Sequence, residues 1–285
     1  MQRRAWINVA LAAGVAAMAA VAWLKPGKQD TEVAVSKLAP ADVKAIRVEK
    51  AGREIAQLAR GADGWRLTAP FAARADEIMV QRLTGILGAK AGEKLPATGL
   101  ARYDLDPPFA RLTFDSQSFS FGTFNAVVGA QYVLTNGGIY LLAPRYAAGI
   151  PDEAPALASK QLFASGEAPV AIALPGFRVE SVGGKWMLSP GRGDLSQDDL
   201  ARWMDEWRLA SALAVGGAPE QRMKEAIKVT LKDGRAVELD IVQREPDLVL
   251  ARRDERLTYR IAKATAARLL APPSAPDGKE AAPAK

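Results

Sequence analysis

Apolar and polar residues alternate with a period of two over short stretches of this chain, as in strands that turn one face toward a core. Residues 43–50, residues 54–59 and the run around Trp65 show this pattern, with turn-forming residues between them, so a three-strand meander is expected. Asp76 is expected to cap a helix, since after it the apolar period lengthens to three or four residues, and this helix should end near Gly88. One face of that helix should cover the sheet.

The same order of elements returns in the second half of the chain. Three strands are expected at residues 170–174, 177–181 and 185–188, and Ser196 is expected to cap a helix over residues 196–210. Further elements are predicted in both halves: strands at residues 110–114, 118–124, 131–135, 139–142, 226–231, 236–242, 248–252 and 257–261, a short helix and loop within residues 151–163, and a last helix at about residues 263–270.

Corresponding positions in the two halves keep a nearly constant spacing. Trp65 precedes Trp186 by 121 residues, and Tyr140 precedes Tyr259 by 119 residues. Such a slow drift favours an internal duplication. The predicted fold class is α+β, with an N-terminal transmembrane helix followed by two related units, each an antiparallel sheet backed by a helix.

The predicted transmembrane helix is the charge-free run of residues 5–24, which as a helix would span roughly 30 Å, the thickness of a bilayer core. Arg3 and Arg4 precede it and Lys25 follows it, and the slight excess of positive charge before it favours a cytoplasmic N-terminus. A cleavable signal peptide is the alternative, since residues 17–19 have the small-x-small pattern of a cleavage site. Either interpretation exports the folded part.

These patterns divide the chain into consecutive segments. The C-terminal segment is rich in Pro, Ala and Lys and too poor in bulky apolar residues to order itself. The predicted organisation is a cytoplasmic tail at residues 1–4, a transmembrane anchor at 5–24, a linker at 25–42, a first α+β unit at 43–165, a second α+β unit at 166–270 and a disordered tail at 271–285.

Composition narrows the possible functions. Lys and Arg number 38 against 32 for Asp and Glu, and part of this excess lies on the two sides of the apolar segment. The chain is therefore not expected to have the concentrated positive charge that binding of nucleic acid requires. The chain has no Cys and no His, which excludes thiolate metal sites, cysteine nucleophiles and His-dependent catalytic triads.

Two loop motifs are candidate binding sites. Asp104 and Asp106 have the spacing of paired carboxylates that hold a divalent metal, but the prolines after them favour a rigid turn in which the aspartates cap local N–H groups. Gly191-Arg192-Gly193, ahead of the Ser196 helix, has the composition of an anion-binding loop, and a plain flexible loop is the favoured interpretation.

Three other groups have a structural explanation beside a functional one. A Ser/Lys dyad is the common nucleophile system left to a chain without His or Cys, and Ser159 and Lys160 are the candidate pair. They are only neighbours in the sequence and belong to no recognised motif, which disfavours this assignment. Trp203 and Trp207 would form a ligand platform or, at helical spacing, part of the core. The group of Arg252, Arg253 and Arg256 is interpreted as a solvated hairpin end rather than a headgroup site. No residue is assigned to catalysis, to a cofactor or to a metal.

The run of residues 64–76, the helix after it and the Tyr-Asp-Leu-Asp-Pro-Pro connector at residues 103–108 resemble a bacterial membrane-anchored family, domain of unknown function 4340. The resemblance covers residues 40–165 well and the second copy loosely. Family members often have Tyr-Gly-Leu at the connector, where this chain has Tyr-Asp-Leu. The resemblance implies single-pass, envelope-facing domains, some encoded beside ABC-type transporters and auxiliary proteins of the gliding-motility type, and it transfers no catalytic residue.

The leading hypothesis is a non-enzymatic binding or scaffold protein in the bacterial inner membrane, held in the lipid bilayer by residues 5–24, with most of its chain in the periplasm. Its expected partner is a membrane protein, such as an ABC-type transporter, or another envelope complex. Two alternatives stay open: a periplasmic hydrolase or transferase acting on envelope polymers, and a module that binds a small envelope ligand. No cofactor and no nucleic acid are expected.

Overall fold

The structure, a computed structural model, describes residues 6, 11–20, 32–191, 195–221 and 223–274. It has a mixed fold of mostly antiparallel sheets with a few helices. The strands predicted at residues 110–114, 226–231, 248–252 and 257–261 have those bounds, and the other strands predicted with bounds differ from the observed ones by one or two residues at their ends. Alternation in the sequence therefore located most of the sheet residues.

The first sheet has nine strands in the order β5-β4-β3-β2-β8-β9-β10-β11-β7. Its strands are β2 (Ala45–Lys50), β3 (Arg53–Gly61), β4 (Gly64–Ala69), β5 (Ala73–Arg74), β7 (Leu95–Pro96), β8 (Ala110–Phe114), β9 (Gln117–Asn125), β10 (Ala130–Thr135) and β11 (Gly138–Leu142). A separate pair joins β1 (Val33–Ala34) to β6 (Lys90–Ala91).

The second sheet has eight strands in the order β14-β13-β12-β16-β17-β18-β19-β15. They are β12 (Pro169–Leu174), β13 (Phe177–Val182), β14 (Lys185–Ser189), β15 (Ala214–Gly217), β16 (Ala226–Leu231), β17 (Ala236–Gln243), β18 (Leu248–Arg252) and β19 (Leu257–Ile261). From β4 to β7 the first sheet has the same succession of strands as the second sheet from β14 to β15, and both have a bulge where β9 meets β10 and β17 meets β18.

Each helix that follows a Trp-containing strand, α2 (Glu77–Thr84) in the first half and α4 (Gln197–Arg208) in the second, has an N-cap residue whose side chain accepts hydrogen bonds from backbone N–H groups. Asp76 accepts hydrogen bonds from the N–H groups of Ile78 and Met79 at the start of α2, and Ser196 forms a capping box with Asp199 at the start of α4. Both predicted caps are confirmed. The helical segments are η1 (Pro40–Asp42), α2, η2 (Gly85–Gly88), η3 (Leu100–Tyr103), α3 (Arg145–Ala148), η4 (Ala154–Leu157), α4 (Gln197–Arg208) and α5 (Lys263–Leu270).

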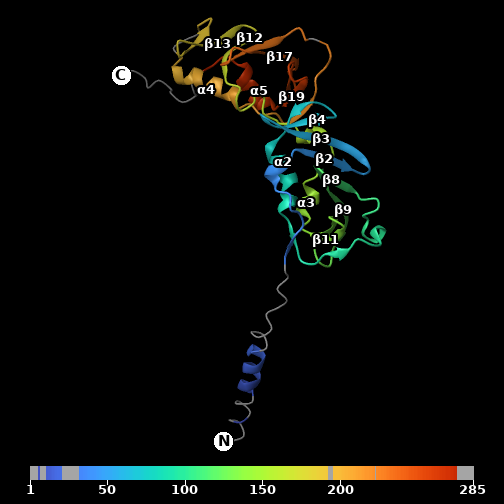
Figure 1. The fold of residues 1–285 in the computed structure, drawn as a ribbon. Helices are drawn as coiled ribbons and strands as arrows, with labels where there is room; N and C mark the ends of the chain where they lie inside the picture. Colours follow the sequence, from blue (N-terminus) through green and yellow to red (C-terminus); the bar gives the residue numbers. More distant parts are fainter. Residues whose placement is uncertain (1–5, 7–10, 21–31, 192–194, 222, 275–285) are drawn as a thin grey trace.

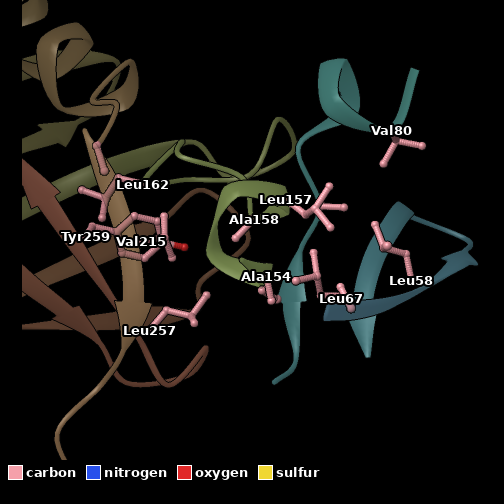
Figure 2. Packing of buried hydrophobic residues seen from close by; sticks show 14 of the residues in the cluster. Leu58, Leu67, Val80, Ala154, Leu157, Ala158, Leu162, Val215, Leu257 and Tyr259 are labelled. Atoms are coloured by element: carbon pink, nitrogen blue, oxygen red, sulfur yellow. The ribbon is translucent and has the colours of Figure 1, made fainter. Parts of the chain in front are cut away.

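The apolar core continues from the first sheet into the second. Figure 1 shows the two sheets with α2 beside the first and α4 and α5 beside the second, and Figure 2 shows Leu157 and Ala158 between side chains of the two sheets. Leu67 of β4 and Leu257 of β19 belong to the same buried cluster. Burial of apolar surface on both sides of residues 157–158 stabilises the contact between the sheets.

Residues 157–162, which we call the linker segment and which differ from the predicted linker at residues 25–42, also connect the two sheets through backbone hydrogen bonds. The N–H of Ser159 donates to the carbonyl of Arg74 in β5 at 2.7 Å, so one end of the segment extends the first sheet. The N–H of Leu162 donates to the carbonyl of Ala210 at 3.0 Å, beside the second sheet. The predicted short helix within residues 151–163 is present as η4, and the expected loop after it is tied down by two isolated bridges, from Ala158 to Ala75 beside β5 and from Gln161 to Ser211 ahead of β15.

The structure describes only parts of the predicted terminal segments. Within the predicted anchor, residues 6 and 11–20 are helical, and the remaining anchor residues lie outside the described residues, as do the predicted tail at 1–4 and residues 275–285. Across the described ranges, no helix combines the length and the apolar character needed to cross a bilayer.

Candidate functional site

A groove of about 720 Å³ lies where the connector approaches β9. We call it the connector groove. Its volume is within the range of sites that hold a small ligand or a few side chains. It is lined by Ala51, Gly52, Asp104, Pro107, Pro108, Phe109, Gly122, Thr123, Phe124 and Gln131.

The connector is held against β9 by a close backbone approach. Gly99 and Asp104, on either side of η3, both have left-handed backbone conformations, which turn the chain toward the sheet. The carbonyl oxygen of Tyr103 lies so near Gly122 that a Cβ added there would be 2.0 Å from it. Leu105, which is 3% exposed, packs over the same glycine. A glycine in β9 therefore allows the connector to form one wall of the groove.

A buried amide lies at the bulge between β9 and β10. Gln131 is 7% exposed and lines the groove, and its Nε2 donates to the carbonyl of Gly122. Within the described ranges, this is the one hydrogen bond made by the Gln131 side chain, and no fully buried side-chain polar atom is left without a partner. The second polar atom of the amide, Oε1, is therefore accessible from the groove as an acceptor.

Aromatic side chains give the groove an apolar wall. Phe109 is 39% exposed and its ring centroid is 6.2 Å from that of buried Phe121, and Phe124 is 49% exposed. The turn after Phe124 continues this apolar surface, since Val127 is 96% exposed and Val128 is 62% exposed. Clustered exposed apolar side chains are typical of surfaces that bind a partner.

The two aspartates of the connector are both exposed, and Asp104 lines the groove. Among the residues that the structure describes, no cluster of acidic side chains is arranged to hold a metal. The predicted rigid turn is present, with a bridge between Leu105 and Pro108, but the expected caps are not: neither aspartate side chain hydrogen-bonds to a local N–H group in the described chain. The left-handed conformation of Asp104 and the prolines that follow shape the turn through the backbone instead.

The remaining predicted sites lie elsewhere. Arg192 and Gly193 of the Gly191-Arg192-Gly193 motif lie outside the described residues. Ser159 and Lys160 belong to the linker segment, where the N–H of Ser159 donates to Arg74 of β5 and the carbonyl of Lys160 accepts from Ala212 ahead of β15. No hydrogen bond joins their side chains in the described structure.

Trp203 and Trp207 are core residues, as their spacing favoured. Their exposed fractions are 5% and 0%, and their indole N–H groups donate to the carbonyls of Ala271 and Leu269 at 3.0 and 3.1 Å. Both bonds hold α4 against the end of α5.

The interpretation of Arg252 as part of a solvated hairpin end is wrong. Arg252 is 1% exposed, and its two terminal nitrogens each lie 2.7 Å from one carboxylate oxygen of Glu167. Its Nη1 also donates to the carbonyl of Leu162 in the linker segment at 2.8 Å. The guanidinium of Arg253 also has a partner, since it forms an ion pair with the carboxylate of Asp240. Arg256 is exposed, as predicted. Charge alone suggested solvation, but the fold brings a carboxylate from a distant segment to Arg252.

A second arginine, whose side chain is 16% exposed, completes this ionic cluster between the sheets. Arg74 of β5 donates to Glu255 at 2.6 Å, to the hydroxyl of Tyr259 at 3.1 Å and to the carbonyl of Gln161 at 2.7 Å. Arg74 thus contacts the second sheet and the linker segment from the edge of the first. We call Arg74, Glu167, Arg252, Glu255 and Tyr259 the junction cluster.

The charges of the junction cluster stabilise one another. Burial acts to raise the pKa of Glu167, but hydrogen bonds from Arg252 and from the N–H of Ala164 outweigh it, so this pKa lies below its ordinary value. Burial and the negative charge of Glu255 raise the pKa of Tyr259 above its ordinary value. Glu167 is therefore ionised and Tyr259 neutral at neutral pH. No motif marks this cluster, because Arg74 and Glu167 come from segments that lie far along the chain from each other and from residues 252–259.

One of the comparisons with known proteins finds a match. The family model described as Domain of unknown function (DUF4340) matches residues 65–223, which is more than half of the chain. The matched region runs from the Trp65 strand through the connector, the linker segment and α4 to beyond β15. No curated protein and no solved structure matches the chain. By the extent of the family match, this chain belongs to the DUF4340 family.

Proposed function

We propose that this protein is a non-enzymatic binding and scaffold protein of the bacterial inner membrane, with two related sheet units held in the periplasm. Residues 5–24 form its single transmembrane helix in this proposal, and an ABC-type transporter or another envelope complex is its partner. The charge-free run with basic flanks supports the anchor, and the family resemblance supports the kind of partner.

The observation that carries this proposal is the junction between the sheets. The linker segment hydrogen-bonds to β5 on one side and to residues 210–212, just before β15, on the other, and Arg74 and Arg252 bind carboxylates and also carbonyls of this segment. Loss of Arg74 would leave the carboxylate of Glu255 with a cation only at 3.8 Å, and loss of Arg252 would leave Glu167 with one only at 3.4 Å, which is costly for largely buried charges. Such contacts oppose relative movement of the two sheets, which suits a protein that braces a complex.

Purification of the full chain tests the proposal. The chain, tagged at its C-terminus, is extracted from membranes in a mild detergent and its partners are identified by mass spectrometry. A tagged fragment of residues 1–42, which keeps the predicted anchor and linker but lacks both sheets, is the control. We expect transporter or envelope-complex subunits with the full chain and not with the fragment. Repeated recovery of the full chain without partners would contradict the scaffold function.

The orientation is tested separately with reporters fused to the C-terminus. A reporter that is active only in the periplasm should give a signal, and a reporter that is active only in the cytoplasm should not. The opposite result would refute the proposed location while leaving the contact between the sheets unaffected.

A further inference from the structure

The connector groove has an apolar wall that the fold leaves uncovered. Phe109 and Phe124 both line the groove and keep 39% and 49% of their surface exposed. Pro107 and Pro108 add rigid apolar surface at the connector. Aromatic side chains in such positions are frequent anchors of protein contacts, because they bury a large area and lose little conformational freedom.

A nearly buried polar group faces the same space. Gln131 is 7% exposed, and in the described structure its amide has one side-chain hydrogen bond, to the carbonyl of Gly122. The remaining acceptor of this amide is available to an N–H group of a molecule in the groove. A few placed polar groups within an apolar lining are what give a binding site its specificity.

The one charged residue among those that line the groove is an aspartate. Asp104 lines the groove, and Asp106 is exposed next to Pro107. Neither aspartate forms an ion pair with any residue in the ranges that the structure describes, although the chain as a whole carries a net charge of +6. Lys50 and Arg53 flank the opposite wall but do not line the groove, and the Lys50 amine is paired with Asp152.

We propose that the connector groove binds a segment of a partner protein that carries an apolar side chain beside a Lys or Arg. The apolar side chain packs against Phe109 and Phe124, and the basic side chain lies near Asp104 and Asp106. A backbone N–H of the bound segment donates to Gln131. This inference rests on the proposed function and names the class of partner segment that the scaffold takes.

A protein segment fits these observations better than a lipid surface. Exposed Phe124, Val127 and Val128 would enter a membrane, but Asp104, which lines the groove together with Phe124, and exposed Asp106 repel the anionic headgroups of bacterial phospholipids. A basic and apolar segment satisfies both the carboxylates and the aromatic wall. Complementary charge of this kind also selects the partner.

Peptide selection tests the proposal without knowledge of the partner. A phage-displayed library of random twelve-residue peptides is panned against the full chain purified in detergent. We expect enriched peptides that combine Lys or Arg with an aromatic or aliphatic residue. No enrichment over the Phe124→Ser chain, or enrichment of peptides without basic residues, overturns the proposal.

Matched variants then locate the binding. The consensus peptide is synthesised with a fluorescent label, and its Kd is measured by anisotropy. Phe124→Ser and the double variant Asp104→Asn/Asp106→Asn should each raise the Kd about tenfold. Val182→Ser and Asp63→Asn, exposed residues of the same type elsewhere, should change it less than about twofold. Equal effects of both sets would overturn the assignment to the groove, and the surface aspartate pair keeps the test valid if Phe124→Ser fails to fold.

A single label distinguishes protein from lipid as the occupant. The chain has no Cys, so Thr123→Cys places one environment-sensitive fluorophore in the groove of the full chain in proteoliposomes. We expect its emission to shift to the blue when the consensus peptide is added and to be insensitive to brominated lipids. Quenching by brominated lipids before peptide is added would overturn the proposal in favour of a membrane contact.

The groove and the scaffold function fail in different ways. If the peptide binds but no partner copurifies with the full chain, the scaffold proposal falls and the groove assignment stands. If partners copurify equally well with wild type and with Phe124→Ser, the scaffold stands and the groove assignment falls.

Discussion

Replacement of Gly122 by Ala tests the idea that a close backbone approach shapes the connector groove. An added Cβ would lie 2.0 Å from the carbonyl oxygen of Tyr103 and 2.8 Å from Cγ of Leu105. Ordinary contact begins at 3.4 Å, and the nearest atom belongs to the backbone, so the connector must move by more than 1 Å rather than one side chain rotating away. That movement withdraws buried Leu105 from the sheet.

We expect Gly122→Ala to lower the free energy of unfolding by about 3 kcal/mol, the sum of overpacking and lost burial of one leucine. Urea unfolding of the full chain in detergent, followed by tryptophan fluorescence, measures the change. Gly88→Ala is the matched control, because an added Cβ there meets nothing within 4 Å, and it should change the free energy by less than about 0.5 kcal/mol. Equal midpoints for the two variants would refute the argument.

Three further predictions concern the junction and the helix cap. Arg74→Ala should destabilise the protein by about 3 kcal/mol, because it removes the cation 2.6 Å from the largely buried carboxylate of Glu255 and leaves only Arg252 at 3.8 Å, and urea unfolding measures the loss. The pKa of Glu167 lies below its ordinary value of 4.5, so its contribution to the free energy of unfolding is complete above pH 4.5 and is lost as the pH falls through the lowered pKa. Glu167→Gln should therefore flatten the dependence of stability on acid pH in unfolding curves. Ser196→Ala should cost about 1 kcal/mol by removing the capping box with Asp199, as thermal unfolding would show.

Matched controls separate these effects from general damage. Arg66→Ala removes an exposed arginine from the same region as Arg74, and Ser181→Ala removes an exposed serine from β13. Each should change the free energy of unfolding by less than about 0.5 kcal/mol. A loss with Arg66→Ala equal to that with Arg74→Ala would contradict the role of the junction cluster, and an unchanged acid dependence in Glu167→Gln would contradict its ionisation in the folded state.

Most regular elements were predictable because their signals are local. Alternation of apolar residues located strands such as β16 and β19, and the caps at Asp76 and Ser196 located the starts of α2 and α4. The short strands β5, β7 and β15 were not predicted. Strands of two to four residues carry too little pattern to be recognised, and they exist because a neighbouring strand offers free backbone groups.

The candidate sites were only partly predictable. The connector was recognisable from its prolines and aspartates, but its position against Gly122 was not, because a close contact between residues far apart in the chain leaves no local pattern. Arg252 was misinterpreted for the same reason. From sequence alone, a cluster of arginines is expected to be exposed to solvent, because no acidic partner can be identified. Only the fold brings the carboxylate of Glu167 to Arg252.

The sequence by itself determined the strands, the helix caps, the charge-free N-terminal run and the absence of Cys and His, since each depends on residues that are neighbours or near neighbours in the chain. Only the tertiary structure decided which charges are buried and paired, how the linker segment joins the two sheets, and where the connector groove opens. Those features depend on long-range contacts whose energies are set by burial, and burial is a property of the whole fold.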